Sequence, residues 1–180
     1  MKRKFDMMAN NRNRADLLAR LEPYWKMEAA NAVCIPMVIL LLSEARLGWI
    51  SLVPMAAMIL MLIIGAAYWR GKVRHLQGAS QDWDGLLDMI GRARVPALIL
   101  TIVGCAAAAA GWIDSSLARG TADRVTAAGC AILALLEYVN YYHRQLQHFD
   151  NRADFKRMLA GKGFRRSWMA RDLAERARRA

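Results

Sequence analysis

The sequence is poor in residues and motifs that build metal sites and catalytic centres. It contains three cysteines and three histidines in 180 residues. No cysteine pair has metal-ligand spacing, and thiols inside apolar segments usually serve as small packing residues. A phosphate-binding loop, a Gly-x-Ser-x-Gly elbow and a His-Glu-x-x-His motif are also missing. We therefore expect no metal, no cofactor and no catalytic residues.

Acidic residues are scarce, with 15 Asp and Glu against 26 Lys and Arg, and the net charge is +11. Such a charge ordinarily suggests a nucleic acid partner. Here, however, 23 of the 26 basic residues lie in residues 1–26, 70–94 and 144–180, and the others are Arg46, Arg119 and Arg124. This is the positive-inside pattern of membrane proteins. It argues against nucleic acid and predicts a bacterial inner-membrane protein with both termini in the cytoplasm.

Apolar residues are concentrated in four blocks, 27–43, 50–69, 95–113 and 125–142. A helix needs about 20 apolar residues to cross a bilayer core of roughly 30 Å. The pattern predicts an all-α membrane domain over 27–142, a four-helix bundle of two antiparallel hairpins joined by a cytoplasmic loop at 70–94. The uncharged centre of the second block, 55–67, is expected to face lipid over much of its surface. The basic N-terminus leads into no immediate apolar region, so no cleavable signal peptide is expected.

Short helices are predicted in the cytoplasmic segments. Residues 1–26 form the N-terminal segment, with a disordered start at 1–12 and a short helix from Asn13 that Pro23 ends. An amphipathic helix is predicted at 81–92, and Pro96 suits the first turn of the third span. In the basic tail, 143–180, helices are predicted at 151–160 and 167–179. Asn-Arg-Ala-Asp occurs at both 13–16 and 151–154, either from duplication of a hairpin or, as we favour, because capped helices resemble one another.

Glu137 is the acidic residue deepest in a predicted span, where an ionisable group costs about 2 to 3 kcal/mol or less. Helical periodicity places it toward other helices, and counting at 1.5 Å per residue puts polar residues of the first and fourth spans at a similar depth. The predicted intramembrane polar cluster contains Glu28, Asn31, Glu137, Asn140 and Tyr141. It serves either as interhelical hydrogen bonding or as a proton, cation or headgroup site. A metal site from Glu28, Glu137 and His143 lacks supporting spacing.

Small residues four apart in the third span predict that another helix backbone approaches it closely. The small residues of the fourth span are expected to pack against the third. The predicted packing residues are Gly104, Ala107, Ala108, Gly111, Ala127, Cys130 and Ala134.

The tail alternates basic and apolar residues in a pattern that suits an anionic membrane surface or a partner helix. The predicted lipid-surface residues are Phe164, Arg165, Arg166, Trp168, Arg171, Arg176, Arg178 and Arg179.

Together these patterns favour a non-catalytic scaffold or regulatory subunit that binds anionic lipid of the cytoplasmic leaflet and forms a homo-oligomer or joins a larger membrane complex. The alternatives are an oligomeric channel or small transporter that uses Glu137 and, third, a lipid-acting membrane enzyme.

Overall fold

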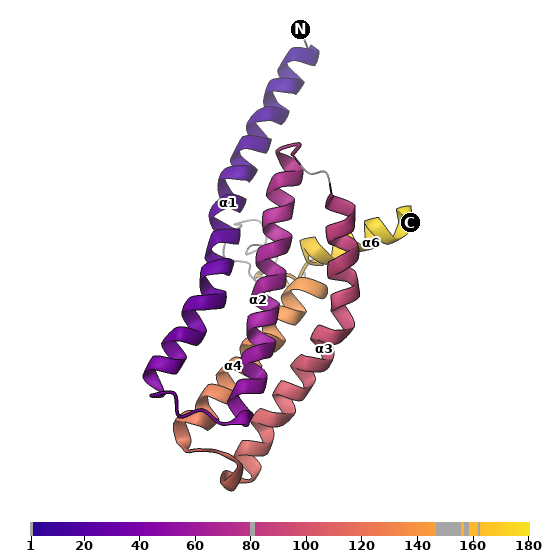
Figure 1. The fold of residues 1–180 in the computed structure, drawn as a ribbon. Coiled ribbons are helices and arrows are strands. Elements are labelled where there is room, and N and C mark those ends of the chain that lie inside the picture. Colours follow the sequence, from indigo (N-terminus) through magenta and orange to yellow (C-terminus); the bar gives the residue numbers. More distant parts are fainter. Residues whose placement is uncertain (1, 80–81, 147–155, 157–158, 162) are drawn as a thin grey trace.

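The computed structural model describes residues 2–79, 82–146, 156, 159–161 and 163–180. These residues form α1 (Lys2–Leu42), α2 (Trp49–Leu76), α3 (Trp83–Ile113), the 3₁₀-helix η1 (Ser115–Leu117), α4 (Thr121–Tyr142) and α6 (Trp168–Arg179) (Figure 1). Helices make up 83% of the structure, and no strand occurs among the described residues. The all-α prediction is confirmed, as are four helices long and apolar enough to span a membrane. The helix predicted at 151–160 falls largely outside the described residues.

The four long helices lie side by side, and successive ones run in opposite directions (Figure 1). We call the end that holds η1 and the 43–48 turn the loop end. The opposite end, nearer both termini, is the terminal end.

α1 runs from Lys2 to Leu42 with Pro23 and Pro36 inside it. The predicted disordered start and the separate short helix ended by Pro23 were therefore wrong. An interior proline removes one backbone hydrogen bond and bends a helix, but it need not end a helix whose flanking residues favour helix. Glu22 and Lys26 form an i,i+4 ion pair of 3.0 Å across Pro23, and such pairs support a helical turn.

α3 is also continuous, with Pro96 inside it. The helix predicted at 81–92 is thus the first part of α3 and not a separate element, and this boundary was wrong. Leu87 and Ile90, from the part before Pro96, are buried in the same cluster as Tyr68 of α2 and Tyr142 of α4. This packing keeps the part before Pro96 in line with the span that follows.

α2 is the central helix, because it packs against α1, α3 and α4. In the most apolar 18-residue stretch of α2, 56% is buried inside the structure, against 11% in that of α1. The expectation that its centre faces lipid was wrong, since the residues buried there include Met55, Ala57, Met58, Met61, Leu62 and Ile64. Composition could not show this, because helix contacts and lipid contacts are equally apolar in a membrane.

The small residues do lie at helix contacts, but often against α2. A Cβ on Gly104 would lie 2.9 Å from the Cα of Pro54, and one on Gly111 would lie 2.6 Å from Cδ1 of Ile50. On α4, Cys130 and Ala134 join a cluster whose other members come mainly from α2. Gly104 and Gly111 therefore let α2 approach α3 closely, whereas the expected packing of Cys130 and Ala134 against the third span was wrong. Ala108, Ala127 and Ala131 do pack together between α3 and α4.

α6 begins and ends close to its predicted bounds and crosses the long helices beside α3 (Figure 1). Ser167 caps it by accepting a hydrogen bond from the Ala170 N–H at 3.1 Å. Two further bonds fasten the residues before α6 to the end of α4: Ser167 N–H donates to the His143 carbonyl at 3.2 Å, and Gln145 N–H donates to the Arg165 carbonyl at 2.9 Å. Met169 is buried in the main core, so α6 is part of the folded structure.

Candidate functional site

The predicted polar cluster comes together at the terminal half of the helices. The Tyr141 hydroxyl donates to Glu28 Oε1 at 2.8 Å, and both side chains are buried. Asn140 Nδ2 donates to Glu137 Oε2 at 3.4 Å, while its Oδ1 accepts from the Leu146 N–H at 2.9 Å. Glu28, Asn31 and Glu137 line one cavity of about 140 Å³. The structure thus places two carboxylates and an amide around a small space between α1, α2 and α4.

Gly65 of α2 makes room for this cluster. A Cβ at that position would lie 2.1 Å from the Tyr141 hydroxyl and 2.4 Å from its Cζ. The tyrosine ring therefore occupies the space that a side chain on α2 would fill. The bond between Tyr141 and Glu28 depends on this close approach.

α6 is held to α2 by an ion pair that the sequence analysis missed. Lys72 Nζ lies 2.7 Å from Asp172 Oδ2, and each side chain is only 14% exposed. The Tyr68 hydroxyl donates to the same oxygen at 2.6 Å. Because all three side chains are largely removed from water, this contact holds α6 in one position more firmly than an exposed pair would.

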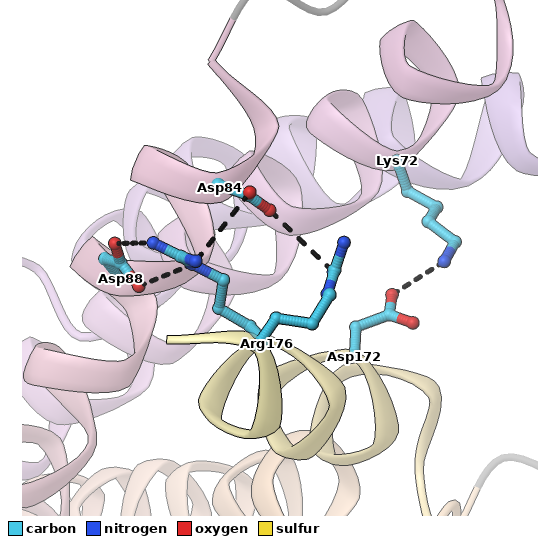
Figure 2. Close-up of polar contacts among 6 residues, drawn as sticks. Lys72, Asp84, Asp88, Asp172 and Arg176 are labelled. Carbon is cyan, nitrogen blue, oxygen red and sulfur yellow. Dashed lines mark hydrogen bonds and ion pairs between the residues drawn. The ribbon is translucent and has the colours of Figure 1, made fainter.

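A second set of contacts holds the far end of α6 to α3 (Figure 2). Arg176 donates from Nε and Nη2 to the two oxygens of Asp88, at 3.1 and 2.9 Å. Asp84, one turn earlier, lies 3.8 Å from both Arg176 and Arg179. The hydrogen bond to Asp88 raises the pKa of Arg176 above its ordinary value. Two acids four residues apart in a basic chain are a sequence signal that could have identified this contact.

The predicted lipid-surface residues separate into two groups. Arg176 faces α3 and is used for docking, whereas most of the set is exposed: Phe164, Arg165, Arg166, Trp168, Arg171, Arg178 and Arg179. Arg171 stacks on Trp168 with its guanidinium carbon 4.4 Å from the ring centroid. Four of these residues lie in α6 and three lie just before it, and we call the seven together the basic face of α6. The opposite face of the helix is occupied by the protein.

At the loop end, Asp123 is a buried carboxylate that the sequence analysis did not identify. Its Oδ1 accepts from the Gly48 N–H at 3.0 Å and from the Ser51 hydroxyl at 2.5 Å. Its Oδ2 accepts from the Arg119 N–H at 2.9 Å. One side chain thereby joins α4 to the start of α2, where a negative charge also suits the helix N-terminus.

Within the described residues, no group of three His, Cys, Asp or Glu side chains is placed to hold a metal ion. Comparison with protein-family models, with curated proteins and with solved structures found no match. The class of this protein therefore rests on its own structure. Four helices long and apolar enough to cross a bilayer indicate an integral membrane protein.

Proposed function

We propose that this chain is a non-catalytic scaffold or regulatory subunit of the bacterial inner membrane. Its four long helices form an antiparallel bundle in the bilayer, with the terminal end in the cytoplasm. The basic face of α6 binds anionic lipid and a protein partner there. The uneven distribution of Lys and Arg supports this orientation.

The observation that carries the proposal is the fixed position of α6. A basic tail that served only to set the topology would need no docking, yet α6 is joined to α2 through Asp172 and to α3 through Arg176. Its buried residues Met169 and Ala170 face the protein, and its exposed arginines face outward. A rigid charged surface is pre-organised, so a partner that binds it does not have to order a flexible chain.

The test is site-specific photo-crosslinking in cells. A photoreactive residue replaces Arg166 on the basic face and, in a control, Ser115 at the loop end; both positions are exposed. We expect a discrete crosslinked protein from position 166 that is absent from position 115. The variant Arg178→Gln/Arg179→Gln should weaken that crosslink without changing expression. A smear identical at both positions, or a product unaffected by the charge removal, would contradict the proposal.

The polar cluster supports a second candidate, an oligomeric channel or small transporter. Glu28 and Glu137 line the same small cavity within the membrane part of the helices, and intramembrane carboxylates commonly mark ion or proton pathways. Asn31 adds a polar group that suits a cation or water. A membrane enzyme acting on lipid ranks third.

Proteoliposomes separate this candidate from the scaffold. If Glu137 only bonds helices together, Glu137→Gln should change stability by about 1 kcal/mol or less, near the average for such bonds in membranes. Glu137→Leu should destabilise more, because it leaves the Asn140 Nδ2 group without its acceptor. A proton or cation flux that the wild type supports and the folded Gln variant loses would favour transport over the scaffold.

A further inference from the structure

A second cavity, of about 410 Å³, lies at the terminal end between α1 and the start of α6. The lining residues of α1 recur three or four positions apart, so they lie on one face of that helix. α2 contributes the turn that ends at Lys72. Asn140 and Tyr141 come from the end of α4. Its lining includes Arg20, Tyr24, Trp69, Lys72, Arg165 and Arg171. A volume in this range fits a small-molecule site.

The charge of this cavity selects an anion. The described residues that line it include four cations, Arg20, Lys72, Arg165 and Arg171, and no carboxylate. Lys72 is matched by Asp172, which lies outside the lining. Arg171 is held over Trp168, so its guanidinium is ordered before any ligand arrives. Guanidinium groups bind phosphate oxygens through paired hydrogen bonds.

Along the helix axes, the lining of the cavity changes from aromatic residues deeper between the helices to charged residues nearer the terminal end. On α1, Tyr24 lies one turn deeper in the bundle than Arg20, and on α2, Trp69 lies deeper than Lys72. Tyr24 and Trp69 pack edge to face with their centroids 5.3 Å apart. The indole N–H of Trp69 is buried, and in the described part of the chain it has no hydrogen-bond partner. Aromatic groups deeper between the helices and cations nearer the terminal end form the environment that a lipid meets at the headgroup level.

We propose that this cavity binds one anionic phospholipid. Its phosphate lies among Arg20, Arg165 and Arg171, and its glycerol and first acyl carbons lie against Tyr24 and Trp69. The volume accommodates the headgroup and glycerol. The acyl chains continue into the bilayer beside α1, because the apolar stretch of α1 is the least buried of the four membrane-length helices. The inference deepens the proposed anionic-lipid binding and rests on the proposed orientation of the terminal end.

The test counts lipids on the purified full-length protein. Delipidated protein in a neutral detergent is titrated with phosphatidylglycerol, phosphatidylcholine or glycerol phosphate, and binding is followed by native mass spectrometry. We expect one saturable phosphatidylglycerol per chain, with phosphatidylcholine and glycerol phosphate each at least tenfold weaker. Glycerol phosphate as tight as the lipid would show a free phosphate site and overturn the assignment, as would a stepwise series of lipids without saturation.

A matched pair of variants locates the site. Arg20→Gln/Arg171→Gln removes two exposed cations from the cavity, and the distal control pair, Arg92→Gln/Arg94→Gln, removes two exposed cations of α3 that do not line it. The cavity pair should weaken phosphatidylglycerol about 30-fold, since one basic residue near a membrane surface contributes roughly fivefold. The distal pair should change it less than threefold. Arg171→Lys, which keeps the charge, should bind within about twofold of the wild type, against a loss of roughly fivefold if the charge of Arg171 contributed nothing after the change. Equal losses in both pairs would mean surface attraction and refute a cavity site.

The crosslink and the lipid count together distinguish a failure of the scaffold proposal from a failure of the lipid-site proposal. Loss of the position-166 crosslink with one lipid still bound removes the partner-binding scaffold and leaves the lipid site intact. A retained crosslink in protein that binds no phosphatidylglycerol removes the lipid site alone.

Discussion

Asp123 offers the sharpest test of how the loop end is held together. Its carboxylate is 1% exposed and accepts hydrogen bonds from three donors that belong to two separate loops and to α2. Gly48 must be a glycine for this contact, because a Cβ there would lie 2.7 Å from Asp123 Oδ2. Asp123→Ala removes the acceptor and leaves buried donors behind.

The loss of folding free energy in Asp123→Ala follows from these contacts. A hydrogen bond to a charged group contributes roughly 1.5 to 3 kcal/mol, and an unsatisfied buried donor costs about 1 to 3 kcal/mol. The three bonds share one carboxylate and the Arg119 N–H is only part-buried, so we expect about 3 to 5 kcal/mol for Asp123→Ala. Ser51→Ala removes one donor and leaves the carboxylate with two N–H groups, so about 1 kcal/mol is expected.

The assay is reversible unfolding in mixed micelles with increasing dodecyl sulfate, followed by circular dichroism. Asp114→Asn is the matched control, because this carboxylate lies at the same end of the helices but is exposed and accepts its hydrogen bonds from the nearby Ser116. We expect its unfolding midpoint to equal that of the wild type. A midpoint for Asp123→Ala as high as that of Asp114→Asn would refute the reasoning that the buried carboxylate organises this end.

Two further predictions concern helix packing. Gly104→Ala should destabilise by about 1 to 2 kcal/mol, because overpacking against the α2 backbone outweighs the gain in helix propensity; Gly129→Ala, with nothing within 4 Å of its Cβ, should not destabilise in the same micelle assay. Equal unfolding midpoints for the two alanine variants would contradict the close approach of α2 and α3 at Gly104. Asp172→Asn leaves Lys72 without its ion-pair partner and should release α6, seen as at least tenfold faster tryptic cleavage in the tail. Glu175→Gln, at an exposed position of the same helix, should leave that rate unchanged, and equal rates for the two variants would rule out the docking role of Asp172.

Proline shows where local sequence signals mislead. Pro23 and Pro96 were interpreted as helix boundaries, but α1 and α3 continue through both. A proline sacrifices one hydrogen bond, which is a local effect. Whether the helix ends or bends depends on what the next turns pack against, and Leu87 and Ile90 pack on α2 and α4. That contact is formed by residues far apart in the chain.

The polar cluster shows the opposite case, in which counting along the chain was sufficient. Glu28 and Tyr141 are 113 residues apart, yet both were predicted at one depth from their distance to the membrane boundary. The regular rise of a helix makes depth a property of the sequence. The particular pairing of Glu28 with Tyr141, and the space that Gly65 leaves for it, could not be predicted in this way.

The sequence by itself determined that the chain is helical, that four of its helices can cross a membrane and that its basic residues gather in three segments. These properties follow from helix length, hydropathy and charge order, which are all local. Only the tertiary structure decided that α2 is the central helix, that Asp123 serves α2 and that α6 docks through Asp172 and Arg176. The reason is physical: apolar surfaces attract neighbouring helices and lipid alike, so the choice of partner depends on shape complementarity and on which buried charges find a counterpart.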